Sequence, residues 1–187
     1  DVSSLTISFS GSGDIYYTTD CTTPSRSSKK YTGPITITKT TVFRVAAYES
    51  GASRSQILNL TYLINEDDTL ETVCLVPDPY NLWDENYGIY ATGSNPGEYP
   101  YQGANHWRNW ERSASVSLFN QEGTEEFSEY CGLKIFGGYS RANAKKSFAC
   151  MFRAKYGASA LDYPVFGEES LESYESIVLR AGGQEVF

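Results

Sequence analysis

The 187-residue sequence predicts a mainly β protein of two domains, a small β-sandwich followed by a second strand-rich domain. Two observations predict this class. Tyr, Thr and Ser are abundant while Leu and Ala are comparatively few, and such a composition favours strands over helices. Short segments that alternate between apolar and polar residues recur at the roughly 8–12-residue spacing of a small sandwich.

The first domain is expected to span residues 1–64. Its predicted strands are separated by Gly-, Pro- and Asp-containing turns, and residues 25–30 are expected to form a polar loop. The strands are predicted at residues 5–10, 15–18, 35–38, 41–48 and 56–64. The polar, acidic stretch 65–70 follows, and we interpret it as a linker between domains.

The second domain is expected to span residues 71–187. A helical turn is predicted from Asn81 to near Gly88, and residues 91–109 are expected to form a long ordered loop because their Gly, Asn, Pro and Tyr residues follow no period. A short turn is expected at 171–174. The strands are predicted at residues 73–76, 113–119, 133–136, 146–152 and 176–180.

Charge and composition exclude several classes of function. Residues 1–64 carry a net charge of +2 and residues 65–187 a net charge of −10, which argues against nucleic-acid binding. No run of eighteen apolar residues is present, so membrane insertion is not expected. With one His and no Cys-x-x-Cys motif, no metal site is expected. The polar start at Asp1 fits a mature secreted or cell-surface protein, which we expect to be a monomer.

Two family resemblances rest on specific motifs. The segments IYYTTDCTTP, KYTGPITI and TTVFRVAAY resemble the chitobiase/β-hexosaminidase C-terminal-like module, an immunoglobulin-like sandwich that accompanies secreted bacterial proteins. That family usually has Gly where this chain has Cys21. The segments DPYNLWDENYGIY, WERSASVSLFNQEG, GLKIFGGYSRANAKKSFACMFRAKYG and VLRAGG resemble the start of the CotH kinase family, named for a spore-coat protein. Ser113, Ser117, Phe136 and Gln184-Glu185 depart from its pattern.

The CotH resemblance implies an atypical protein kinase whose second domain here is an α+β, strand-rich, kinase N-lobe-like domain. The family's catalytic and metal-binding acids have no counterpart in residues 1–187, so the resemblance implies a non-catalytic N-terminal part with no catalytic residue of its own. ATP with Mg²⁺ or Mn²⁺ would be cofactors of the full-length protein, and a protein substrate would be its partner. The sandwich would serve as a spacer or docking module.

One stretch of the second domain is basic. Residues 131–161 contain no Asp or Glu but hold six of the domain's nine Lys and Arg residues, and Gly137 and Gly138 would let backbone amides approach an anion. By the resemblance, Lys146 is the candidate phosphate-pairing lysine, with Lys145 second and Arg141 in support. The alternative is that these cations are solvated side chains on a hairpin.

Four cysteines allow three disulfide connectivities. If the hairpin turn centres near Arg141, residues whose numbers sum to about 281–283 face each other, which favours a bridge between Cys131 and Cys150. The alternative is a pair of buried thiols. Cys21 and Cys74 lie in different predicted domains and either join them or stay free.

The segment 80–110 is rich in aromatic residues. Trp107, Tyr99 and Tyr101 are candidates for stacking on sugar rings, which would suit a carbohydrate-binding or adhesion module without phosphotransfer and a cell-surface glycan as partner. The interpretation that we prefer is that the rings of this segment fix a long loop to the core.

Overall fold

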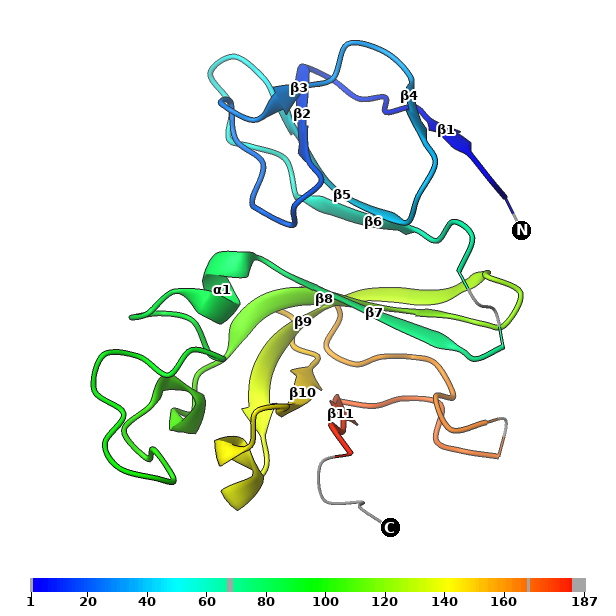
Figure 1. Ribbon diagram of the computed structural model, residues 1–187. Helices are drawn as coiled ribbons and strands as arrows, with labels where there is room; N and C mark the ends of the chain where they lie inside the picture. The colour runs from blue at the N-terminus through cyan, green and yellow to red at the C-terminus, as the bar shows by residue number, and fades with distance from the viewer. Residues whose placement is uncertain (1, 67–68, 168, 183–187) are drawn as a thin grey trace. The chain divides into compact units, whose positions relative to one another are not determined.

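The computed structural model describes residues 2–66, 69–167 and 169–182 (Figure 1). The chain separates into two compact units. One comprises Asp1–Cys74 with Phe119–Thr124, and the other comprises Leu75–Leu118 with Glu125–Phe187. The predicted linker 65–70 lies partly outside the described residues, and Gln184 and Glu185 lie entirely outside them.

The first unit contains two sheets. In the smaller, β1 (Leu5–Ile7) pairs antiparallel with β4 (Ile35–Ile37). The larger has the strand order β3-β2-β5-β6, and each of its neighbouring pairs is antiparallel. Its strands are β2 (Asp14–Thr18), β3 (Lys29–Lys30), β5 (Thr41–Tyr48) and β6 (Leu58–Tyr62).

The core of the first unit draws on both sheets. Ile7 and Ile37 of the smaller sheet pack with Tyr17, Phe43 and Val45 of the larger one, and Phe43 is only 1% exposed. These side chains come from alternating positions, as the sandwich prediction requires. The predicted polar loop 25–30 is wrong at its end, where Lys29 and Lys30 form a short edge strand. Exposed lysines are common on such edges because they discourage pairing with another chain.

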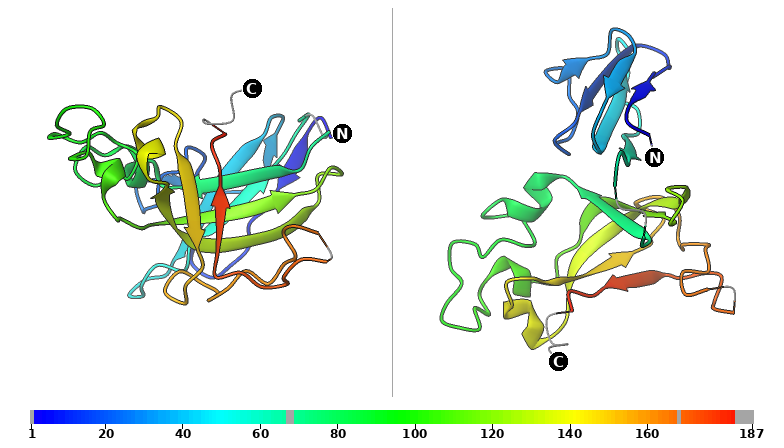
Figure 2. Two further views of the ribbon diagram at one scale, coloured as in Figure 1. Left: turned by 90° about the horizontal axis from the view of Figure 1, so that it is seen from below. Right: turned by 45° about the vertical axis from the view of Figure 1, so that its right-hand side comes forward.

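The second unit is built on a five-stranded sheet with the order β11-β10-β9-β8-β7 (Figure 2). Pairing of β10 with both β9 and β11 is antiparallel. The strands are β7 (Thr72–Pro77), β8 (Arg112–Phe119), β9 (Glu125–Phe136), β10 (Ser147–Met151) and β11 (Ser176–Leu179). The core of the second unit combines side chains of the sheet with side chains from outside its strands. It includes Val116, Leu133 and Cys150 of the sheet, together with Phe152 and Leu161.

Helical structure is scarce. In α1 (Pro79–Trp83), Pro79 occupies the first turn and the Asp78 carboxylate accepts a hydrogen bond from the Tyr80 amide at 3.0 Å, which is a regular N-terminal cap. Two 3-10 turns follow, η1 (Asn105–Trp107) and η2 (Tyr139–Ala142). No helix among the described residues is long and apolar enough to cross a membrane.

The mainly β prediction is therefore confirmed, whereas nothing in the described residues supports an α+β kinase lobe. The second unit also departs from the prediction at β9, which begins at Glu125 and not at residue 133. Three acidic residues at 125, 126 and 129 conceal this part of the strand, because Glu is uncommon in strands. In the structure Ser128 is tied to Ser117 of β8 by a 2.8 Å hydroxyl hydrogen bond.

Candidate functional site

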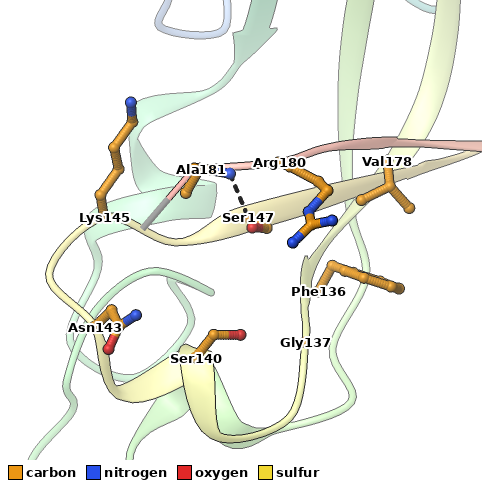
Figure 3. Close-up of a pocket in the computed structure, with 10 residues that line it drawn as sticks. Phe136, Gly137, Ser140, Asn143, Lys145, Ser147, Val178, Arg180 and Ala181 are labelled. Atoms are coloured by element: carbon orange, nitrogen blue, oxygen red, sulfur yellow. Dashed lines mark hydrogen bonds between the residues drawn. The ribbon is translucent and has the colours of Figure 1, made fainter. Parts of the chain in front are cut away.

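An open cavity of about 350 Å³ lies beside the turn that joins β9 to β10 (Figure 3). Phe136 at the end of β9 and Val178 of β11 provide its apolar lining. The described lining contains two cationic side chains, Lys145 and Arg180, and no carboxylate. The cavity therefore combines an apolar wall with positive charge, which suits an anionic ligand.

The turn at Gly137 shapes one side of the cavity. Gly137 has a φ of 113°, a conformation that side chains of L residues rarely adopt. A Cβ atom at this position would also collide with the hydroxyl of Ser140. The glycine is therefore required for the chain to pass from β9 into η2, and Ser140 is thereby brought to the cavity.

Polar groups from three segments meet in the cavity. In Figure 3 the Arg180 guanidinium and the Ser140 hydroxyl point into it, whereas the ammonium of Lys145 points away from its centre. The hydroxyl of Ser147 accepts a 3.0 Å hydrogen bond from the Ala181 amide, which leaves its own hydrogen to donate. An anion in the cavity would therefore meet hydrogen-bond donors from two hydroxyls and one guanidinium.

Lys146, the first phosphate candidate, and Arg141, the supporting one, lie outside this lining. Lys146 is 9% exposed, its Nζ donates to the Asn143 carbonyl at 2.6 Å, and the same atom lies 5.2 Å from the centroid of the Tyr90 ring. Arg141 donates from Nε to the Gly137 carbonyl at 2.6 Å and from one terminal nitrogen to the Trp107 carbonyl at 3.3 Å. Both cations thus brace the turn that forms the cavity wall.

Burial lowers the pKa of Lys146, because an ammonium loses hydration inside the protein. No ion pair among the described residues involves this side chain. Of the cations that the sequence singled out, Lys145 lines the cavity together with Gly137, and Lys146 and Arg141 support it from behind.

His106 lies beside Lys146 and Arg141 and is 3% exposed. Its Nδ1 is 3.3 Å from the Ala91 carbonyl oxygen, which can only accept, so Nδ1 carries the proton. Its Nε2 is buried without a hydrogen-bond partner among the described residues. Burial lowers the pKa of His106 most, the charge of Lys146 lowers it further, the Ala91 carbonyl opposes the change, and Arg141 adds to it. The ring is therefore neutral at pH 7.

Sequence reasoning missed Arg180, Ser140, Asn143 and Ser147. Arg180 reaches the cavity because β11 pairs with β10 in a register that places Leu179 opposite Phe148. The two strands are separated by residues 152–175, and no local pattern announces that pairing. The basic character of the hairpin was the one signal available, and it indicated the turn beside this cavity but not Arg180, which follows β11.

The remaining cations of the basic stretch have other partners. Lys134 donates to the Asn109 side chain at 2.6 Å. Arg153 and Lys155 lie 3.2 and 3.0 Å from the Glu111 carboxylate. Among the described residues, no group of three or more His, Cys, Asp or Glu side chains is arranged to hold a metal ion.

The expected bridge between Cys131 and Cys150 is not formed in the structure, and both residues are free thiols. The register explains this, because Cys150 lies opposite Leu133 and not opposite Cys131. Both thiols are fully buried. The pKa of Cys131 is raised, chiefly by a hydrogen bond with Cys150 and to a smaller extent by burial. Cys21 and Cys74 are partly exposed.

The aromatic candidates divide into two groups. Trp107 is partly buried and donates its indole N–H to the Pro100 carbonyl at 2.8 Å, so this ring fixes its loop. Tyr99 and Tyr101 instead project from the loop and are 59% and 39% exposed. Figure 1 shows this green loop next to the yellow turn that carries η2, in agreement with contacts between η1 and η2.

The comparisons with known proteins concern the first unit. The Fn3-associated family model matches residues 4–62. Residues 4–62 form an Fn3-associated domain. The Fn3-associated domain thus accounts for the sandwich, whereas the comparisons give no support for a CotH kinase in the second unit. No curated protein and no solved structure matches the chain.

Proposed function

We propose that the cavity beside Gly137 binds phosphate groups, and that the second unit is a non-catalytic, phosphate-holding part of a CotH-like kinase. The observation that carries this proposal is the cavity's composition, with Arg180 and Lys145, the hydroxyls of Ser140 and Ser147, and no described carboxylate. Phosphate oxygens accept hydrogen bonds from such donors, and a guanidinium matches their geometry in a bidentate manner.

The ligand that the CotH resemblance implies is ATP. Phe136 and Val178 offer an apolar surface next to the cations, which suits a ligand with a flat apolar part and a charged part. Mg²⁺ and Mn²⁺ require oxygen ligands, chiefly carboxylates, and the described lining supplies none. The residues present therefore do not fit a metal site, and the proposal is limited to the phosphate groups.

We further propose that the protein is exported and that the Fn3-associated domain serves as a spacer or docking module. Domains of this family are typical of bacterial surface and extracellular proteins. The finer resemblance to the chitobiase C-terminal-like module is supported by Cys21, whose φ of 63° lies in the left-handed region that favours glycine. That family usually has glycine at this position.

The phosphate proposal is tested by calorimetric titration of the whole chain with inorganic phosphate, pyrophosphate and ATP, each without metal and at matched ionic strength. Arg180→Ala is expected to weaken binding about tenfold, since a hydrogen bond to a charged group contributes roughly 1.5–3 kcal/mol. Lys145→Ala is expected to weaken binding less, because the Lys145 ammonium points away from the centre of the cavity. Binding of all three ligands would indicate a phosphate site, and preference for ATP would indicate a nucleotide site.

Lys134→Ala is the matched control, because it removes the same charge from the same hairpin outside the cavity. It is expected to leave the dissociation constants unchanged. Equal weakening by Lys134→Ala and Arg180→Ala would reduce the effect to general electrostatic attraction. Absence of binding by all three ligands would refute the proposal.

A further inference from the structure

Three tyrosine rings meet at the surface of the second unit. Tyr99 and Tyr101 come from the loop 91–104, and Tyr139 begins η2. The ring centroid of Tyr99 lies 5.7 Å from that of Tyr101 and 5.9 Å from that of Tyr139, with interplanar angles of 87° and 79°. Tyr99 and Tyr139 are each 59% exposed. We call these three residues the tyrosine corner, in a sense unrelated to the tyrosine corner of immunoglobulin-like sandwiches. None of the three lines the cavity.

The backbone holds the tyrosine corner in place. The amide of Tyr101 donates to the Glu98 carbonyl at 2.7 Å, and the amide of Gly103 donates to the Pro96 carbonyl at 3.0 Å. The indole of Trp107 donates to the Pro100 carbonyl between Tyr99 and Tyr101 at 2.8 Å. A loop backbone that is already fixed loses little conformational entropy when a ligand binds.

The chemistry around the tyrosine corner is neutral and polar. Glu98 is the only charged residue in the segment 91–104. Ser94, Asn95 and Gln102 of the same segment are exposed, whereas no large aliphatic side chain of the segment is. Glu98 repels anions, and the lack of aliphatic surface disfavours a hydrophobic protein partner. Apolar ring faces surrounded by amides and hydroxyls suit a ligand that is itself neutral and rich in hydroxyls.

We propose that the tyrosine corner binds a neutral polysaccharide. A pyranose ring has a face of C–H groups, which can stack on an exposed tyrosine ring, and a rim of hydroxyls, which can bond to the amides of Asn95 and Gln102. The perpendicular rings of Tyr99 and Tyr101 give such a chain two contact surfaces. This site rests on different residues from the phosphate site.

The test is native affinity electrophoresis of the whole chain in gels that contain a neutral β-glucan, a xylan or a galactomannan, followed by titration of tryptophan fluorescence. Trp107 lies in the same loop and is expected to report binding. At least one polysaccharide is expected to retard the protein. Tyr99→Ala and Tyr139→Ala are expected to weaken the affinity about tenfold, and Tyr99→Phe is expected to retain it because the ring remains.

Tyr80→Ala is the matched control, because Tyr80 is 56% exposed and stacks on Tyr87 away from the tyrosine corner. It is expected to bind like the unchanged protein. Lack of retardation by all three gels, or equal loss in Tyr80→Ala and Tyr99→Ala, would overturn the proposal. It would also be overturned if the tyrosine corner mediated dimerisation that Tyr99→Ala abolishes in sedimentation, since the occupant would then be a second copy. Added phosphate is expected to leave retardation unchanged, which separates the two sites.

Discussion

At the scale of single residues, Gly137 controls the shape of the cavity. Its φ of 113° and the collision that a Cβ would make with Ser140 both act against any other residue. We expect Gly137→Ala to destabilise the second unit by about 1–3 kcal/mol, the usual cost of forcing a side chain into such a conformation. Urea unfolding measures the loss, and phosphate titration measures the accompanying loss of binding.

Gly33→Ala is the control for this substitution. A Cβ at Gly33 meets no atom within 4 Å, and Gly33 lies in the first unit. We expect its effect to stay within about 0.5 kcal/mol, as for other surface positions where a substitution meets no packed neighbour. If Gly137→Ala were equally harmless, the turn would not depend on the glycine.

His106 provides a residue-scale prediction about pH. Its folded-state pKa lies below the ordinary value of 6.5, so the unfolded chain binds the proton more readily than the folded chain does. Stability should therefore fall as pH decreases through 6.5 toward the lower folded pKa. Because the sequence contains a single histidine, His106→Asn should flatten this part of a plot of urea midpoint against pH. An unchanged slope in His106→Asn would contradict the assignment.

At the scale of elements, Glu111 fixes the start of β8 to the turn that follows β10. Its carboxylate accepts hydrogen bonds from Arg153 and lies 3.0 Å from the ammonium of Lys155. Burial alone would raise the pKa of Glu111, but hydrogen bonds from Lys155, Tyr156 and Arg153 outweigh burial and lower it. This interaction therefore connects two parts of the second unit only while the carboxylate is charged.

The predicted consequence concerns Glu111→Gln. A carboxyl group whose folded pKa is depressed stabilises the fold above its ordinary pKa of 4.5, and this contribution disappears as pH falls through the folded value. The variant should unfold at lower urea concentration than the unchanged protein at pH 7, and the two midpoints should converge once the pH lies below the folded pKa of Glu111. Glu122→Gln, an exposed turn residue, should match the unchanged protein throughout. A constant difference at all pH values would exclude the electrostatic explanation.

The pairing of β9 with β10 makes a prediction about thiols. Cys131 and Cys150 are free and fully buried, so alkylating reagents should not reach them in the folded protein. Mass spectrometry should show Cys131 and Cys150 alkylated after unfolding without reductant. A species two mass units lighter that resists alkylation until reductant is added would show a bridge and contradict this assignment.

At the scale of the whole molecule, the chain has two separate cores. Phe43 is central to the first unit and Leu133 to the second, and both are almost completely buried. Phe43→Ala should cost about 3–5 kcal/mol and Leu133→Ala about 2–5 kcal/mol. Calorimetry of the whole chain should resolve two transitions, with each substitution lowering one midpoint. If either substitution lowered both midpoints equally, the units would unfold together.

Local sequence patterns were enough to predict the mainly β class, the sandwich of the first unit and most strand positions, because alternation, turn residues and composition act over a few neighbouring residues. It also pointed to the turn at Gly137. Only the tertiary structure decided which side chains line the cavity. Arg180 arrives through β11. Lys146 and Arg141 donate to backbone carbonyls, because a cation that is buried or partly buried needs acceptors. Register between strands distant in sequence depends on how a whole core packs, so local patterns did not reveal it.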